Sequence, residues 1–336
     1  MNIYIYLFKT EEYQRLYNCS LYKVDDIPLE KRQHIFLGVI FILLFLFFEF
    51  FYILCMLTFR KHLKHSCYKI MFYMGINDIL CLFVCGLLTG ILGIYGAVFC
   101  SFPDLIYIAG IFGVVLWYNE TISSILLAFN RCIEISIPSI GEHLFRGYKT
   151  WIWLFLPFLY SIIFGTTFQQ GLFNGLNFSW YTNPHVGYIN DVGNNYINPI
   201  AIINNFFVVS LLPGSYIIFV IILILKKSSS SAFNSSSLSQ KKIFIQVILI
   251  SLINVTTATI YVFMKFFPIN EYIIYLGMFG WFFAHGLKPV IYLSLNKTIR
   301  QDSRFNKTAI STMQINLVEK RKNIQKTLIK TELYKS

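Results

Sequence analysis

Seven long apolar segments dominate this sequence and constrain its fold more than any other feature. A helix needs about 20 apolar residues to cross the hydrocarbon core of a bilayer. Segments of that length cover residues 35–59, 70–94, 105–131, 151–170, 201–225, 243–267 and 272–295. We therefore predict an all-α fold, a seven-transmembrane helix bundle over residues 35–295. Residues 1–34 form an N-terminal segment in this interpretation, and residues 296–336 form a basic tail.

The composition supports a membrane protein and excludes several soluble classes. Hydrophobic residues make up 56% of the 336 residues, and charged residues make up 13%, against roughly 25% in an average soluble domain. So few charges could not solvate the surface of a soluble globule of this length. In a membrane protein, the net charge of +12 indicates cytoplasmic loops near anionic membrane lipid rather than a nucleic-acid site.

The distribution of Lys and Arg predicts the orientation of the bundle. Loops 60–69 and 226–242, segment 131–150 and the tail from 296 hold 21 of these residues. The opposite side holds five, all within residues 1–34. Because cytoplasmic loops carry the excess of Lys and Arg, we expect the N-terminus outside the cell and the tail in the cytoplasm.

Two features of the predicted outer side fit this orientation. Asn18 and Asn177 each begin an Asn-x-Ser sequon, so both are candidate glycosylation sites. Cys19 and Cys100 are the only cysteines of the sequence that are expected on the oxidising side. They are expected to form a disulfide there, and the alternative is two free thiols near the membrane.

Two helix ends resemble motifs of G-protein-coupled receptors. The third predicted span ends in Asn130-Arg131-Cys132, which resembles the Asp-Arg-Tyr motif of rhodopsin-like receptors with both neighbours of the arginine replaced. The seventh contains Lys288-Pro289 followed two residues later by Tyr292, which resembles Asn-Pro-x-x-Tyr with Lys in place of Asn. The resemblance implies that Asn130, Arg131, Cys132, Pro289 and Tyr292 form the switch for G-protein coupling.

The departures from these motifs resemble the nematode serpentine chemoreceptors, and the sequence is most similar to serpentine receptor class T. The similar segments are spread along the chain, at residues 17–19, 68–71, 99–103, 127–132 and 285–300. The resemblance implies a chemosensory receptor whose partners are a small-molecule ligand, a heterotrimeric G protein and membrane lipid. It also implies a multi-pass protein of the plasma membrane, with the sensory cilium as a narrower alternative.

Four ionisable residues lie inside the predicted spans at similar depths. At a rise of 1.5 Å per residue, Glu49, Asp78 and Glu120 lie about 13–17 Å from the basic ends of their helices, and Lys288 lies about 10 Å from its own. Charged side chains at such depth are costly and are usually functional. We expect one polar cluster in which the Lys288 ammonium replaces, as the counter-ion of Asp78, the sodium ion of rhodopsin-like receptors.

The other two carboxyl groups of this cluster are expected to be protonated, or to pair with amides such as Asn77 and Asn119, because like charges at short range cannot both stay ionised cheaply. The alternative is that Lys288 extends to the inner surface and that Glu49 faces the lipid boundary in protonated form. For Arg131, the resemblance implies contact with the G protein or a lock between the third and sixth spans, and the alternative is a membrane-edge arginine.

The ligand pocket is expected in the outer half of the bundle, near aromatic residues of the third and seventh spans. The candidate pocket residues are Tyr107, Gly113, Trp117, Phe279 and Phe282. Gly113 stands 18 residues before Arg131, where receptors for amines carry an acid. A cationic amine is therefore disfavoured, and a small apolar ligand is expected.

Two other functions compete with the receptor. The sequence contains no HExxH or GxSxG motif, so we predict no enzyme, no cofactor and no metal site. A secondary transporter or proton relay could use the intramembrane carboxylates, although no repeated halves are visible in the sequence. Proton-dependent currents would favour that alternative, whereas ligand-dependent nucleotide exchange on a G protein would favour the receptor.

Overall fold

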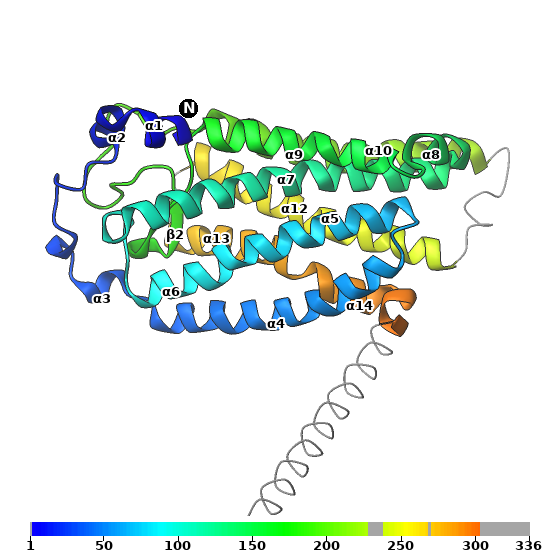
Figure 1. Cartoon of the computed structure of the whole chain (residues 1–336), viewed down its shortest axis with the longest axis horizontal. Helices are drawn as coiled ribbons and strands as arrows, with labels where there is room; N and C mark the ends of the chain where they lie inside the picture. The colour runs from blue at the N-terminus through cyan, green and yellow to red at the C-terminus, as the bar shows by residue number, and fades with distance from the viewer. Residues whose placement is uncertain (1, 228–237, 268–269, 303–336) are drawn as a thin grey trace, which may run out of the picture.

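The computed structural model describes residues 2–227, 238–267 and 270–302, and their long helices lie side by side in one bundle (Figure 1). The predicted serine-rich linker 228–237, the Pro268 turn and the tail beyond 302 lie outside the described residues. Every predicted apolar segment corresponds to a helix or to a series of helices. These are α4 (Ile35–Lys61), α5 (Ser66–Leu82), η2 (Phe83–Leu88), α6 (Thr89–Ile94), α7 (Pro103–Ser136), α9 (Lys149–Thr167), α10 (Pro199–Lys227), α12 (Leu238–Phe266), α13 (Glu271–Gly286) and α14 (Lys288–Leu295).

The seventh predicted span consists of two helices in series. Within the described residues, six helical segments are long and apolar enough to cross a bilayer. The seventh does not reach that length, because α13 has 16 residues and α14 begins only at Lys288. Pro289 has no N–H to donate to the carbonyl oxygen of His285 one turn earlier, so the helical hydrogen-bond ladder is interrupted there.

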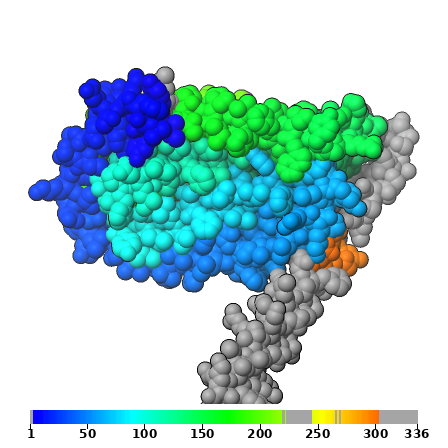
Figure 2. Space-filling view, in the orientation of Figure 1, coloured from blue at the N-terminus to red at the C-terminus, as the bar shows by residue number. Residues whose placement is uncertain are grey.

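Short elements close the two ends of the bundle. Residues 2–34, in blue, cover one end, which we call the N-terminal end (Figures 1 and 2), and α8 lies at the opposite end (Figure 1). Two short strands, β1 and β2, form an antiparallel hairpin, in which Leu172 pairs with Tyr181 and Asn174 with Ser179. None of these short elements was among the helices predicted from the sequence. They are α1 (Asn2–Phe8), α2 (Thr10–Leu16), η1 (Val24–Asp26), α3 (Leu29–Arg32), η3 (Phe99–Ser101), α8 (Pro138–Phe145), β1 (Leu172–Asn174), η4 (Gly175–Asn177) and β2 (Ser179–Tyr181).

The hydrophobic core is divided into two clusters by a buried polar layer. One cluster lies towards the N-terminal end and includes Phe45, Phe99 and Phe282. The other lies towards the opposite end and includes Phe59 and Tyr292. On α5 the buried Asn77 and Asp78, and on α7 the buried Asn119 and Glu120, fall between the residues of the two clusters. A layer that interrupts a close-packed apolar core has to satisfy its own hydrogen bonds, so its members are candidates for function.

A disulfide between Cys19 and Cys100 ties the N-terminal segment to the bundle. The first candidate glycosylation site, Asn18, adjoins this bridge, and its side-chain oxygen accepts hydrogen bonds from the backbone and hydroxyl of Ser20. The second, Asn177, is half-buried in the turn between the two strands. Asn18 is half-buried as well, so both candidate sites are partly accessible.

Tyr107 of α7 supports the N-terminal segment. Its ring lies 4.9 Å from that of Tyr6, 5.2 Å from that of Tyr13 and 5.1 Å from that of Tyr17, measured between ring centroids. The hydroxyl of Tyr6 also donates to Asp104 at 3.0 Å. Tyr107 thus holds the N-terminal segment in place, although the sequence analysis placed it in the ligand pocket.

Protonation of His185 is expected to weaken the closure of the N-terminal end. The imidazole is buried, its Nε2 lies 3.3 Å from the Leu16 carbonyl oxygen, and its Nδ1 has no hydrogen-bond partner in the described part of the chain. Burial lowers the pKa of His185 below its ordinary 6.5. The unfolded state therefore binds the proton more readily, and the stability that His185 contributes is present above pH 6.5 and is lost as the pH falls below it.

We expect the melting temperature to fall by a few degrees more in the wild type than in His185→Gln when the pH is lowered from 7.5 to 5. Thermal unfolding of the two purified proteins across this range measures the difference. Equal pH dependence of the two proteins would contradict the prediction.

Candidate functional site

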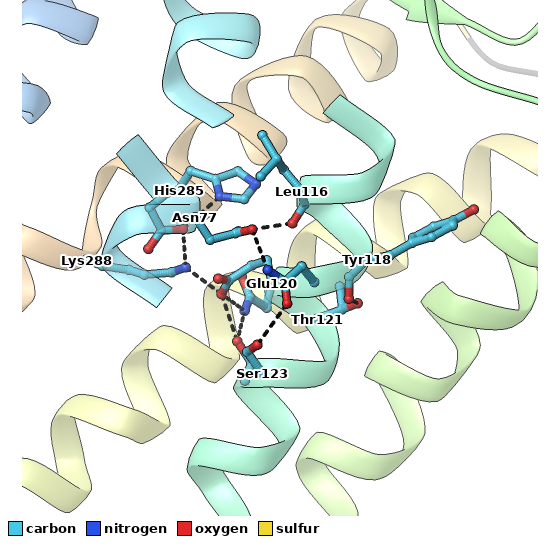
Figure 3. Close-up of polar contacts among 12 residues, drawn as sticks. Asn77, Leu116, Tyr118, Glu120, Thr121, Ser123, His285 and Lys288 are labelled. Atoms are coloured by element: carbon cyan, nitrogen blue, oxygen red, sulfur yellow. Dashed lines mark hydrogen bonds and ion pairs between the residues drawn. The ribbon is translucent and has the colours of Figure 1, made fainter. Parts of the chain in front are cut away.

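The buried polar layer is centred on an ion cluster between α5, α7 and the start of α14. The ammonium nitrogen of Lys288 lies 2.7 Å from Oδ1 of Asp78 and forms a second ion pair with Oε1 of Glu120. All three residues are fully buried. Figure 3 shows the Lys288 side chain reaching towards Glu120. One buried cation is thus shared between two buried carboxylates, an arrangement that compensates part of the cost of removing the three charges from water.

The helix break beside Pro289 contributes a further polar group to this cluster. Because Pro289 donates no hydrogen bond, the carbonyl oxygen of His285 is left without its usual helical partner. The hydroxyl of Tyr52 lies 2.6 Å from this oxygen and 2.8 Å from Oδ2 of Asp78. Tyr52 therefore connects α4 to the interrupted seventh span and to α5.

His285 is a further member of the cluster, and it was not among the residues predicted for it from the sequence. Its Nδ1 lies 2.8 Å from Oδ1 of Asp78, and the residue is fully buried. His285 precedes Lys288 by three residues, a spacing that places two side chains on the same face of a helix. That spacing was the available indication.

Glu120 has two hydrogen-bond partners in addition to Lys288. Its Oε1 accepts hydrogen bonds from the hydroxyl of Ser124 at 2.8 Å and from the amide of Asn254 at 3.1 Å. These contacts link α7 to α12. Asn77 and Asn119, which were named as examples of amide partners, bond to each other at 2.9 Å, and the amide that meets Glu120 is that of Asn254.

Glu49 does not join the cluster. Its side chain is half-buried, and its Oε1 has no hydrogen-bond partner among the described residues. Tyr52, three residues later on α4, takes the contact with Asp78 instead. The depth predicted from helical rise was similar for all the acidic residues, but the rotation of α4 directs Tyr52 rather than Glu49 to the centre.

The cluster also offers a set of atoms that could ligate a cation. Asp78, Glu120 and His285 each present one ligand atom, and these atoms lie within 4.8 Å of one another. Carboxylate oxygens and imidazole nitrogen are common metal ligands. In this structure the Lys288 ammonium contacts the same two carboxylates, so the protein's own side chain supplies positive charge to them.

Near the C-terminal end of α7, Arg131 is held by neighbours on its own helix. Its guanidinium forms an ion pair with Glu134 and donates to Oδ1 of Asn130 at 2.8 Å. The Asn130 amide donates in turn to Ser66 at 3.2 Å and to Glu134 at 3.1 Å. Glu134, three residues after the arginine, thus supplies the acid that the motif lacks at position 130, and the sequence analysis did not single it out.

The other residues of the predicted switch are Cys132 of α7 and Pro289 and Tyr292 of α14. The thiol of Cys132 lies 3.9 Å from the Ser215 carbonyl oxygen of α10. The carbonyl oxygen of Pro289 lies 3.7 Å from the thiol of Cys55. Tyr292 is buried against Phe59, and its hydroxyl has no hydrogen-bond partner among the described residues. Cys132 therefore lies on α7, whereas Pro289 and Tyr292 lie on α14, and the contacts of the three go to different partners.

A cavity of about 270 Å³ lies between α7, α10, α12, α13 and the segment that contains the hairpin. Trp117 and Gly113, two of the candidate pocket residues, line it together with Trp281. A Cβ added at Gly113 would lie 3.2 Å from the ring of Trp281, so this glycine allows the indole to pack closely on α7. Among the described residues that line the cavity, none carries a charge.

Two further candidates for the pocket belong to the apolar core instead. Phe282 is fully buried, with its ring centroid 4.9 Å from that of Phe41. Phe279 lies at the same centroid distance from Phe41. Neither lines the cavity. Both residues face α4, whereas the cavity lies towards α10 and α12.

The cavity adjoins the ion cluster. The indole N–H of Trp117 donates to Oδ1 of Asn205 at 3.1 Å, and both of these residues line the cavity. The ring of Trp117 also meets that of His285 edge-to-face, with 6.0 Å between the ring centroids. One side chain therefore contacts both the cavity and a member of the cluster.

Comparison with known proteins identifies the family. A family model described as "Serpentine type 7TM GPCR chemoreceptor Srt" matches residues 2–316. The chain belongs to the Srt family of serpentine chemoreceptors. Members of this family are receptors rather than enzymes, as the sequence predicted.

A relative and a solved structure agree with this assignment. The Srt chain is 26% identical over 239 residues to Serpentine receptor class T-55 of Caenorhabditis elegans, a match that covers 70% of this chain and 63% of the relative. The crystal structure of squid rhodopsin superposes with a TM-score of 0.62 at 13% identity, covering 85% of this chain and 88% of that one. The second likeness concerns the fold alone, and it supports a rhodopsin-like seven-helix arrangement.

Proposed function

We propose that this Srt receptor binds a small, uncharged and largely apolar ligand in the cavity beside Trp117 and signals to a heterotrimeric G protein at the α8 end of the bundle. The cavity is lined mainly by aromatic, aliphatic and amide side chains and by no charged residue of the described chain. A charged ligand would lose its hydration there without gaining a counter-ion.

The observation that carries this proposal is the contact of Trp117 with both the cavity and His285. A ligand that moves the indole changes the surroundings of the cluster in which His285 meets Asp78. That cluster joins α5, α7, α12, α13 and α14. A ligand therefore needs only to prefer one arrangement of these helices in order to shift the population of the receptor.

The proposed orientation places the N-terminal end outside the cell. The excess of Lys and Arg at the opposite end supports it, since cytoplasmic loops carry such an excess. The disulfide between Cys19 and Cys100 lies at the N-terminal end, and disulfides persist on the oxidising side of the membrane. We infer that the receptor resides in the plasma membrane, with a sensory cilium as the site of sensing.

Ligand-dependent nucleotide exchange tests the proposed function. The receptor, expressed with a G protein and exposed to a panel of volatile compounds, is expected to raise exchange severalfold with at least one uncharged compound. Epitope tags at both termini should be accessible from opposite sides of the membrane. Proton-dependent currents without nucleotide exchange, or two tags on one side, would contradict the receptor.

A further inference from the structure

The cavity contains an oriented amide whose hydrogen-bond donors have no partner. The indole N–H of Trp117 is a donor only, so the side chain of Asn205 has to present its oxygen to it. This fixes the direction of the amide. Its nitrogen makes no hydrogen bond in the described part of the chain, although the residue is 93% buried and lines the cavity.

Two further polar groups around the cavity are also without partners. The hydroxyl of Tyr261 on α12 makes no hydrogen bond with any described residue. The indole N–H of Trp281 on α13 is buried and likewise unpaired within the described chain. Leaving buried donors unsatisfied is costly, so a molecule that supplies an acceptor is favoured at such a site.

Four side-chain amides line the cavity, and the oxygens of all but Gln169 are, in contrast, engaged within the described chain. Oδ1 of Asn198 accepts from the backbone N–H of Ala201 at 2.9 Å, and Oδ1 of Asn183 accepts from that of His185 at 2.8 Å. Oδ1 of Asn205 accepts from Trp117. The polar groups of the cavity wall that lack hydrogen-bond partners are therefore mainly donors.

We propose that the ligand of this cavity is an uncharged molecule with an apolar body and one acceptor oxygen, of the ketone, aldehyde, ester or ether class, bound by the Asn205 amide and the Tyr261 hydroxyl. This inference rests on the proposed function, because it assumes that the cavity is the ligand site. The volume of about 270 Å³ lies just below the range usual for small-molecule sites, roughly 300–1,000 Å³, which suits a compact ligand.

Matched probes test the acceptor oxygen. The full-length receptor in detergent is titrated with 2-heptanone, heptane, heptylamine and heptanoate, and affinity is derived from the increase in melting temperature. A thiol-reactive dye reports unfolding, because Cys55, Cys67, Cys81 and Cys85 are free and buried. We expect 2-heptanone to bind about three- to tenfold more tightly than heptane, and the two charged probes to bind least.

Two variants assign this preference to the named residues. Tyr261→Phe keeps the ring and removes the hydroxyl, and Asn205→Leu removes the amide at similar volume. Each is expected to weaken binding of 2-heptanone about threefold or more, while the affinity for heptane changes less than twofold. Tyr95→Phe, whose ring is 66% exposed at the N-terminal end, is the control and should bind both probes as the wild type does.

The outcomes separate this inference from the receptor proposal. Equal affinity for heptane and 2-heptanone, absence of 2-heptanone binding, or a ketone preference that survives both substitutions would each overturn the acceptor assignment. Ligand-dependent nucleotide exchange could still be observed in those cases, and the receptor proposal would stand. Tighter binding of heptylamine or heptanoate than of 2-heptanone would overturn both the acceptor assignment and the uncharged ligand.

Discussion

Replacing Lys288 with Met is expected to abolish signalling and to destabilise the receptor by about 3–5 kcal/mol, because it leaves two buried carboxylates without their shared cation. Asp78 and Glu120 both contact the ammonium and are fully buried. The melting temperature should fall by roughly 10 °C, and less receptor should reach the cell surface. Thermal unfolding of purified protein and surface labelling of cells measure the two effects.

Compensating substitutions distinguish lost charge balance from lost packing. Asp78→Asn and Glu120→Gln, added to Lys288→Met, remove the unpaired charges at nearly constant volume and should restore much of the stability. Glu49→Gln is the matched control, because Glu49 has no ion pair or hydrogen bond to the cluster. Wild-type signalling and surface expression in Lys288→Met would refute a role for the ion cluster.

Replacing Arg131 with Ala is expected to abolish ligand-dependent nucleotide exchange without removing the folded receptor. In the proposed orientation Arg131 lies near the cytoplasmic surface, where its guanidinium is paired with Glu134. Removing the acid of this pair instead of the arginine should raise basal nucleotide exchange. In Glu134→Gln the arginine is released, and about 1 kcal/mol of pairing energy corresponds to roughly a fivefold rise in basal exchange.

A second ion pair near the same end of the bundle provides the control. Glu142 lies 3.3 Å from Arg146, and both side chains are more than 60% exposed. Glu142→Gln removes the same type of charge, so it should leave both basal and ligand-dependent exchange unchanged. Wild-type nucleotide exchange in Arg131→Ala would show that this arginine lies at the membrane edge without a role in G-protein coupling.

For the interrupted seventh span, the sequence predicts the helix but not its contacts. The apolar run 272–295 predicted one span, and the helix break beside Pro289 follows from the missing N–H of proline. The consequence of this break for the site could not be read from the sequence. It requires that Tyr52, more than 200 positions earlier, meets the freed carbonyl oxygen of His285.

The residues predicted for the switch and the pocket have contacts that the sequence shows only in part. Asn130 and Arg131 do bond to each other, but their common partner Glu134 was overlooked. Gly113 and Trp117 line the cavity, whereas the other predicted pocket residues pack into the apolar core or support the N-terminal segment. Aromatic side chains suit all of these places, so residue type alone did not separate them.

By itself, the sequence determined the apolar helices, the asymmetry of Lys and Arg between the two ends, and the approximate depth of each buried charge. Those properties follow from the thickness of a bilayer and from the fixed rise of a helix. Tertiary structure decided which charges meet: it joined His285 to Asp78 and left Glu49 aside. Depth depends on position along a helix, but contact also depends on the rotation of that helix about its axis, which only packing against its neighbours fixes.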